Sequence, residues 1–466
     1  MTFQHSRRQS SVRLFPDMEH MENRQLMTVS PTWFEQVAPS APTTIELRSW
    51  RNSTLEVVSN EWVVTFKESS VRGINSVAKV SRLLNQGRTR FQVIEGLGQV
   101  GSVLVRSIGG DMATVSAALK SNPRVSSFAP NYVLSASSMP NDPQLPELWG
   151  LNNEGQSGGT FDADIDAPEA WDLTSGSPSV VVAVIDSGVD YLHSDLASNM
   201  WKNPGEVPNN RLDDDQNGFI DDVYGYDFVN NDSDPMDDNG HGTHVAGTIA
   251  AAGNNSRGVV GIAYGAKVMA LKFLNAFGFG ESKDAIRAIN YATMMKKNRG
   301  VPIVATNNSW GGGPYNQGLE SAIRDANTSN ILFVAAAGNN YRQNIDVDPY
   351  YPAAYLLPNV IAVAALDYND QLAAFSNFGK NRVHVAAPGV SILSTTRRNG
   401  LQPGDNYGVL SGTSMAAPHV SGTLALMASR RPGATAGNLK SALLATVDPI
   451  TSLAGLVSTS GRINAR

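Results

Sequence analysis

From about residue 141 onward, short and almost continuously apolar runs alternate with stretches of helical periodicity. Runs of this kind are typical of parallel strands covered on both faces, because a half-exposed strand would alternate apolar and polar residues. The pattern predicts an α/β fold, a doubly wound and mostly parallel sheet with helices on both faces. The predicted strands are 180–185, 267–273, 301–307, 331–336 and 360–365.

Residues 46–135 have a different pattern, whose predicted order of elements is βαββαβ. This order is typical of a small α+β, ferredoxin-like domain. The predicted strands are 61–67, 90–94, 102–106 and 124–133, and the predicted helices are 74–84 and 112–119. Residues 1–45 are polar and end in a stretch rich in Pro, Ser, Ala and Thr, so we expect a leader or linker without fixed structure there.

The composition of the 466-residue chain indicates a folded protein of about two to three domains. Hydrophobic residues make up 41% of the chain, and the net charge of −6 comes without a basic run that would favour nucleic acid as a partner. The chain has no cysteine, which excludes a disulfide framework, a thiolate zinc site and a cysteine nucleophile. No apolar run reaches the ~18 residues of a membrane-spanning helix, so no membrane span is predicted.

Candidate chemistry begins at the end of the first predicted strand of the α/β region. In segment 182–188 (Val-Ala-Val-Ile-Asp-Ser-Gly) an apolar run leads directly into Asp186. This places a carboxylate at the carboxyl edge of the sheet, where open α/β sheets bind their ligands. The motif alone decides little, because an aspartate at a strand end serves equally well as the cap of the next helix.

A second motif is Asn-Gly-His-Gly-Thr-His at 239–244. In it, His241 lies between two glycines at the start of a predicted helix. The alternative is that His241 and His244 bind a metal. Against this, the pair lacks the intervening glutamate of an H-E-x-x-H zinc helix.

The third motif is Ser-Gly-Thr-Ser-Met-Ala-Ala-Pro at 411–418, followed by an apolar helix rich in small residues. Ser414 is therefore expected at a helix N-terminus, where backbone N–H groups stabilise negative charge on a bound acyl oxygen. The simpler alternative is a serine that only caps the helix.

Together the three motifs supply the parts of a nucleophilic serine. A hydroxyl is a weak nucleophile at neutral pH, so it needs a base within hydrogen-bond reach and an acidic group that orients the base. Ser414, His241 and Asp186 are the candidates for these roles. Their order in the chain, Asp then His then Ser, is that of subtilisin and differs from the orders in chymotrypsin and the α/β-hydrolases.

The wording of all three motifs resembles the subtilisin family, especially its thermitase-like branch, over residues 141–466. The resemblance implies a serine endopeptidase that acts on proteins or peptides through an acyl-enzyme, in which Asp186 steadies the imidazolium, His241 is base and then acid, and Ser414 attacks the scissile carbonyl. It also implies that Asn339, in Ala-Gly-Asn at 337–339, joins the Ser414 N–H in binding the oxyanion. The substrate-binding residues implied are Ser309, Trp310, Gly311 and Gly338, with Trp310 where many members have Leu.

The acidic residues concentrate between Asp213 and Asp238. Segment 213–218 (Asp-Asp-Asp-Gln-Asn-Gly) has the D-x-D-x-N-G opening of a calcium loop, in which Asp213, Asp215 and Asn217 would supply oxygen ligands. Position 12 of this loop is Tyr224 instead of the usual glutamate. The residues expected to close the loop are therefore Asp221 and Asp222. The alternative is a solvated acidic turn.

Two further calcium sites are implied by the resemblance to thermitase-like proteins. One lies just before the catalytic histidine, and its expected ligands are Asp227, Asp232 and Asp234. The other combines distant residues, and its expected ligands are Asp142, Asp195 and Asn255. Bound calcium would stabilise a cysteine-free extracellular protein by mass action.

The same resemblance gives the N-terminal domain a role. Residues 46–135 resemble the family's propeptide, an intramolecular inhibitor and folding assistant, and residues 136–140 would be the linker at which the peptidase domain, 141–466, cleaves itself free. The alternative is a permanent accessory domain. A secreted or periplasmic bacterial protein that acts as a monomer is the expected biological form.

Two other functions fit single features of the sequence. Residues 155–159 (Gly-Gln-Ser-Gly-Gly) match the G-x-S-x-G motif of serine esterases, but no buried strand precedes them, as the esterase nucleophile requires. A non-catalytic scaffold that only binds calcium or partners is the second alternative. The intact set of Asp186, His241, Asn339 and Ser414 argues against it.

Overall fold

The structure, a computed structural model, describes residues 45–50, 53–72, 74, 76–85, 89–132, 139–398 and 406–466. The chain forms two compact units, residues 1–136 and 137–466. The predicted leader, 1–45, lies outside the described residues except for Ile45, and so does most of the predicted processing linker, 136–140.

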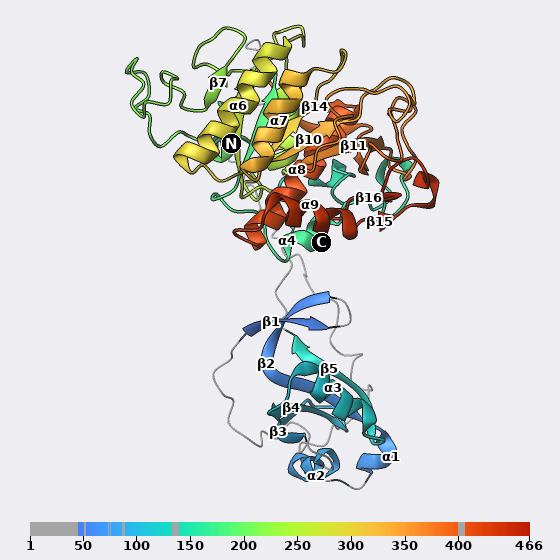
Figure 1. Cartoon of the computed structure of the whole chain (residues 1–466). Helices are drawn as coiled ribbons and strands as arrows, with labels where there is room; N and C mark the ends of the chain where they lie inside the picture. Colours follow the sequence, from blue (N-terminus) through green and yellow to red (C-terminus); the bar gives the residue numbers. More distant parts are fainter. Residues whose placement is uncertain are drawn as a thin grey trace, which may run out of the picture. The chain divides into compact units, whose positions relative to one another are not determined.

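The larger unit is built on a nine-stranded sheet with the order β15-β16-β12-β11-β10-β9-β6-β8-β7 (Figure 1). All its pairings are parallel except β15 with β16. The five strands predicted for this region are confirmed, with ends that shift by one or two residues. The strands are β6 (Val181–Asp186), β7 (Gly225–Asp227), β8 (Lys267–Lys272), β9 (Ile303–Asn308), β10 (Leu332–Ala336), β11 (Val360–Leu366), β12 (Val385–Pro388), β15 (Asp448–Pro449) and β16 (Gly461–Arg462).

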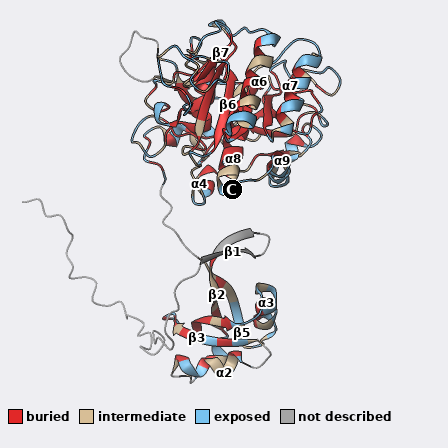
Figure 2. Ribbon diagram, turned by 60° about the vertical axis from the view of Figure 1, so that its left-hand side comes forward, coloured by how far each residue is buried: buried red, intermediate tan, exposed pale blue. Residues whose placement is uncertain are grey.

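Helices cover both faces of this sheet, which confirms the predicted fold class. Along β6, Val182 and Val184 pack on one face and Val181, Ala183 and Ile185 on the other. Each fully buried Val or Ile contributes about 1.5–3 kcal/mol to folding, and Figure 2 shows the strands as the buried centre of the unit. The first face is covered by α4 (Ala167–Trp171), α5 (His241–Ala250), α8 (Thr413–Arg430) and α9 (Ala436–Ala445), and the second by α6 (Ser282–Arg299) and α7 (Gln317–Thr328).

The topology marks one place on this sheet as special. Strand β6 has β8 on one side and β9 on the other, so the chain changes winding direction at β6. Open α/β sheets bind their ligands outside the carboxyl ends of the strands at such a point. The carboxyl end of β6 is Asp186.

Shorter elements complete the larger unit. Strands β13 (Ile392–Thr396) and β14 (Asn406–Leu410) form an antiparallel pair outside the main sheet. The 3₁₀ turns are η4 (Leu145–Glu147), η5 (Gln156–Gly158), η6 (Ala197–Asn199) and η7 (Thr451–Leu453). Across the described residues of both units, no helix combines the length and apolar character needed to cross a membrane.

The smaller unit is an antiparallel sheet of five strands, with the order β1-β2-β4-β3 and β5 paired to β2. It has its own core, which includes Trp62, Val64, Phe66 and Leu119. The strands are β1 (Ile45–Trp50), β2 (Ser53–Phe66), β3 (Arg90–Gly96), β4 (Ser102–Ile108) and β5 (Val125–Tyr132), and the helices are α1 (Glu68–Val71), η3 (Val77–Val80), α2 (Ser81–Leu84) and α3 (Met112–Ser121).

Two details of the smaller unit differ from the prediction. A first strand, β1, forms a hairpin with an extended β2, although no strand was predicted before residue 61. Its sequence, Ile-Glu-Leu-Arg-Ser-Trp, begins with the apolar and polar alternation of a half-buried strand. The predicted helix 74–84 is a 3₁₀ turn followed by one short helical turn, η3 and α2.

One buried cation secures the end of the main sheet. The Arg462 side chain on β16 is 5% exposed and forms ion pairs with Asp370 at 2.7 Å and Asp448 at 2.9 Å. It also donates to the carbonyl oxygen of Asp162 at 3.1 Å, which ties the strand to the start of the unit.

Replacing this arginine tests its contribution. Arg462→Ala leaves two carboxylates without their buried partner, and we expect a loss of about 3–5 kcal/mol in the free energy of unfolding, measured by urea denaturation. Arg324→Ala is the control, because it breaks an exposed pair with Glu320 on α7 and should cost less than about 1 kcal/mol. Equal losses in the two variants would contradict this prediction.

Candidate active site

Strand β6 presents Asp186 as a fully buried carboxylate at the carboxyl edge of the sheet. Its Oδ1 atom accepts hydrogen bonds from the Ser187 N–H and from His241 Nδ1, both at 2.7 Å. The Oδ2 atom is buried and has no hydrogen-bond partner among the described residues. The structure therefore brings together two of the three residues predicted to carry the chemistry.

A second carboxylate holds the helix that bears His241. Asp237 is buried and accepts hydrogen bonds from the N–H groups of Asn239, Gly240 and Thr243 and from the Thr243 hydroxyl, so it caps the start of α5. It also accepts from the Ser187 hydroxyl at 2.9 Å, which ties the helix end to the residue after Asp186.

Close backbone approach fixes the same contact between β6 and α5. A Cβ atom added at Gly242 would lie 2.0 Å from the carbonyl oxygen of Gly188. Only glycine allows the first turn of α5 to come this near to the chain that leaves β6. Gly242 is thus needed to bring His241 within hydrogen-bond distance of Asp186.

The environment of His241 sets its protonation. Burial lowers the pKa of the imidazole, but the charge of Asp186 and the hydrogen bond to it raise the pKa more, so the pKa lies above its ordinary value. The side chain remains 26% exposed. A histidine placed in this way can accept a proton on Nε2 while Nδ1–H stays bonded to the carboxylate.

Ser414 is the second residue of α8, and a proline determines what holds it. Pro418 lies four residues later and has no N–H, so the carbonyl oxygen of Ser414 lacks its usual helical partner. The Ser309 hydroxyl donates to that carbonyl oxygen at 2.8 Å, and Ser414 Oγ donates to the Ser309 carbonyl oxygen at 3.1 Å. The end of β9 and the start of α8 are therefore joined in both directions.

The second pairing of the predicted triad, between His241 and Ser414, is not formed in this state. Within the described residues, no hydrogen bond joins Ser414 to His241, because the serine hydroxyl donates to Ser309. Catalytic hydrogen bonds are commonly long without substrate and tighten when the reacting groups bind.

Two hydrogen-bond donors converge beside Ser414. Asn339 Oδ1 accepts from the N–H and the hydroxyl of Thr413, at 2.9 and 3.0 Å, which directs the Nδ2 atom away from that residue. A Cβ atom added at Gly412 would lie 3.4 Å from Asn339 Nδ2 and 3.6 Å from the Ser414 nitrogen. The Ser414 N–H is in the first helical turn, where no intrahelical acceptor exists. The pair can therefore bind one oxyanion.

Two of the four predicted substrate-binding residues, Gly311 and Gly338, lie against an aromatic ring that was not predicted, that of Tyr350. A Cβ atom added at Gly311 would lie 2.3 Å from the Tyr350 ring, and one added at Gly338 would lie 2.8 Å from it. The ring therefore fills the space that the two glycines leave open. Trp310 packs instead against Phe273 and Phe333, with ring centroids 4.8 and 6.3 Å away.

The first predicted calcium loop contains one cluster of possible ligands. Carboxylate oxygens of Glu206, Asp213 and Asp215 lie within 4.8 Å of one another. Glu206 is buried, and this burial raises the pKa of its carboxyl group, which a bound cation would reverse. Glu206 was not predicted, because it precedes the D-x-D-x-N-G motif by seven residues whereas the motif places the closing ligand after it.

The residues expected to close this loop have other partners. Asp221 accepts from the N–H groups of Asn210 and Arg211. Asp222 accepts from the side chains of Asn203, Asn217 and Tyr291, so its oxygens are used in hydrogen bonds that stabilise the loop. The Asn217 N–H in turn donates to Asp213 and Asp215.

The third predicted calcium site is brought together from distant parts of the chain. The Asn255 side chain donates to Asp195 at 2.7 Å, and the N–H groups of Asn254 and Asn255 donate to Asp142. Asp142 and Asp195 are buried, and burial raises the pKa of both carboxyl groups.

In the second predicted site, the three carboxylates do not form a cluster like that of Glu206, Asp213 and Asp215. Asp227 is buried and directs its oxygens to Val229 and Asn230, whereas Asp232 and Asp234 are exposed. Among the described residues, this segment contributes nothing to the acidic cluster.

The esterase alternative fails on local structure. Its motif, 155–159, includes the 3₁₀ turn η5 and is not preceded by a strand of the main sheet. A nucleophile elbow needs a strand that leads directly into a helix.

A parallel sheet that ends in a buried Asp–His pair, together with a serine at the start of a buried helix, is the arrangement of an α/β serine hydrolase. A family model described as the subtilase family, Peptidase_S8, matches residues 177–461, and the chain belongs to that family. The predicted family, fold and class of enzyme are thereby confirmed.

Named relatives agree with this assignment. The chain is similar to a thermophilic serine proteinase of Bacillus sp. (strain AK1), with 37% identity over 87% of this chain and 86% of the relative. It is similar to thermitase of Thermoactinomyces vulgaris, with 40% identity over 65% of this chain and 92% of thermitase. Among solved structures, a protease from Pseudoalteromonas arctica has a TM-score of 0.55 and 32% identity, over 70% of this chain and 98% of that protein.

The environment of His241 predicts how activity depends on pH. The imidazole must be neutral to act as a base, so kcat/KM should fall as the pH drops through its raised pKa. In Ser414→Ala, NMR titration of the His241 ring should give a pKa above the ordinary value for histidine. Adding Asp186→Asn removes the charge while burial remains, so the pKa should fall; an unchanged pKa would contradict this account.

Proposed function

We propose that this subtilase is a secreted, calcium-stabilised endopeptidase that is made with its own inhibitory N-terminal domain and cleaves peptide bonds through an acyl-enzyme. The observation that supports the chemistry best is the hydrogen bond between Asp186 and His241 at 2.7 Å, on the same sheet edge as the donors around Gly412.

The proposed reaction uses each group in turn. Ser414 Oγ attacks the scissile carbonyl carbon while His241 Nε2 takes the hydroxyl proton, and the carbonyl oxygen becomes an oxyanion bound by Asn339 Nδ2 and the Ser414 N–H. The carbon–nitrogen bond then breaks as His241 gives its proton to the leaving amine. Water attacks the acyl-enzyme by the same route, with Asp186 holding the imidazole throughout.

Two variants test this mechanism. The wild type should hydrolyse casein, and a serine-directed sulfonyl fluoride should inhibit this hydrolysis. Ser414→Ala should abolish the hydrolysis, because the nucleophile is gone. Asn339→Ala should keep the fold and lower kcat by about 10²–10³-fold, the loss established for the corresponding donor in subtilisin itself. Casein hydrolysis that survives in Ser414→Ala would refute the assignment of the nucleophile.

Tyr350 suggests a substrate preference. Its ring lies against Gly311 and Gly338, two of the residues predicted to bind substrate, and we propose that these glycines flank the side chain that precedes the scissile bond. The ring is half-buried, and burial raises the pKa of its hydroxyl. We infer that the primary pocket is shallow and favours substrates with small side chains at this position.

Removing the ring tests the preference. In Tyr350→Gly, the ratio of kcat/KM for a peptide with Phe before the scissile bond to that for a matched peptide with Ala should rise by at least about 10-fold, since even one more methylene group buried in a hydrophobic pocket is worth about that much. Tyr341→Gly changes an exposed tyrosine and should leave the ratio unaltered. A ratio unchanged in Tyr350→Gly would place the pocket elsewhere.

The inhibitory role of residues 46–135 is supported by the organisation of the chain. These residues belong to a compact unit with its own core, and the chain that leaves β5 leads to the start of the peptidase unit. We propose cleavage within 136–140. Intact-mass analysis should find processed protein for the wild type and the full-length chain for Ser414→Ala, whereas processing in both would exclude self-cleavage.

Calcium fits the acidic cluster on chemical grounds. Three carboxylates within 4.8 Å repel one another unless a cation or protons neutralise them, and hard oxygen ligands suit calcium. Glu206, Asp213 and Asp215 would hold the ion and so stabilise the irregular segment 202–224. The cluster around Asp142 and Asp195 is the second candidate.

Removal of the metal tests this role. At free calcium about 100 times the dissociation constant, a site present only in the folded state adds about 2.7 kcal/mol, so a chelator should lower the melting temperature. Glu206→Gln should reduce this calcium-dependent shift, whereas Asp325→Asn, on the exposed face of α7, should not. A shift of wild-type size in Glu206→Gln would remove this residue from the site.

The proposed setting follows from these parts. Protein and peptide substrates are the expected partners, together with the N-terminal domain as an inhibitor, and the enzyme is proposed to act as a monomer outside the cytoplasm. Stabilisation by calcium suits that setting, because a cysteine-free chain there has no disulfides to rely on.

A further inference from the structure

Strand β8 ends in a lysine that is buried beside the active site. Lys272 pairs in register with Asp186 of β6 on one side and with Asp227 of β7 on the other. Its side chain is only 2% exposed. Burying an ammonium ion is costly unless its three N–H groups are bonded and its charge is paired.

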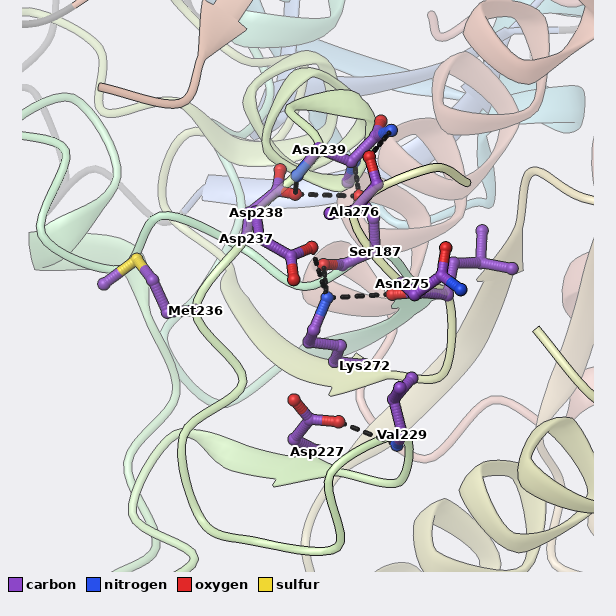
Figure 3. Close-up of polar contacts among 12 residues, drawn as sticks. Ser187, Asp227, Val229, Met236, Asp237, Asp238, Asn239, Lys272, Asn275 and Ala276 are labelled. Atoms are coloured by element: carbon purple, nitrogen blue, oxygen red, sulfur yellow. Dashed lines mark hydrogen bonds and ion pairs between the residues drawn. The ribbon is translucent and has the colours of Figure 1, made fainter. Parts of the chain in front are cut away.

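All three N–H groups of this ammonium have acceptors (Figure 3). Lys272 Nζ donates to the carbonyl oxygens of Ser187 and Leu274, both at 2.8 Å, and to Asp238 Oδ1 at 2.6 Å. Asp238 supplies the opposite charge, and its side chain is 45% exposed. The three acceptors together therefore fix the position of the ammonium group, because only there are all three of its N–H groups bonded.

Each acceptor belongs to a different segment of the active site. Ser187 directly follows Asp186 and donates its N–H to that carboxylate. Asp238 lies three residues before His241. Leu274 lies in the loop after β8, and in the same loop the Ala276 carbonyl oxygen accepts from the Asn239 side chain at 3.0 Å.

We propose that Lys272 is a positioning residue for the Asp186–His241 pair, acting through its ion pair with Asp238. Asp237 ties the start of α5 to the Ser187 hydroxyl, and Lys272 ties the next residue of the same loop, Asp238, to the Ser187 carbonyl oxygen. Both contacts are made to Ser187, one through its hydroxyl group and one through its carbonyl oxygen. Together they hold the loop that leads to His241. This inference rests on the proposed peptidase function and adds a residue that the reaction depends on without touching substrate.

The pair can be tested by a double-mutant cycle on peptide hydrolysis. Lys272→Met and Asp238→Asn should each lower kcat by about 10- to 100-fold, the range that a displacement of ~1 Å at a catalytic group produces, and leave KM nearly unchanged. The double variant should lose no more than Lys272→Met alone, because the two residues act as one unit. Lys267→Met, at the opposite end of β8, removes the same charge and should retain wild-type kcat.

A spectroscopic readout separates positioning from general destabilisation. The downfield proton resonance of His241 Nδ1–H reports the hydrogen bond to Asp186, and it should shift or broaden in Lys272→Met and Asp238→Asn but not in Lys267→Met. If Lys272→Met fails to fold, Asp238→Asn decides alone, because its side chain is partly exposed. This resonance can be measured even if the wild type cleaves no peptide, an outcome that would refute the proposed function and not this inference.

Unchanged kcat and an unchanged resonance in both variants would overturn the proposal. Losses that add in the double variant would overturn it too, since they would show that the two residues act separately. A fall in kcat that matches the fraction of active sites lost on titration with a serine-directed inhibitor would reduce Lys272 to a structural residue.

Discussion

The site depends on a carboxylate that is buried at the end of the central strand. Asp186 is fully buried, and its bonded oxygen accepts from one backbone N–H and one imidazole. A charge removed from water in this way is stable only when its partners are held in place. The features around it, from the Asp237 cap to the close approach at Gly242, bring His241 to that oxygen and keep it there.

The sheet provides this arrangement because of its topology. Neighbours on both sides of β6 end at the same edge, so residues that are far apart in sequence meet there. Asp186 comes from β6, Ser309 follows β9, Asn339 follows β10, and Ser414 lies on the helix that crosses the same face. The parallel strands and the helices that follow them thus bring together the proposed base, nucleophile and oxyanion donors without any one segment having to carry them all.

The sequence predicted what depends on short, regular patterns. The five longest strands of the main sheet were visible as apolar runs, and Asp186, His241 and Ser414 stood in motifs whose glycines mark tight approaches. What it missed depends on irregular chain paths. Glu206 reaches the acidic cluster from the opposite side of a loop, and Tyr350 meets Gly311 and Gly338 from a distant segment, so no spacing rule could find either contact. A signal for Lys272 was available, because a charged residue at the end of an apolar strand is unusual.

The proline in α8 has a consequence for how the active site can move. Because Pro418 leaves the carbonyl oxygen of Ser414 for the Ser309 hydroxyl, the backbone that carries the proposed nucleophile and the backbone proposed to bind substrate share two hydrogen bonds. A shift of either segment would break both bonds at once. The segment that carries Ser414 and the segment that carries Ser309 should therefore behave as one rigid body during turnover, and any adjustment to different substrates must come from the loops that border them.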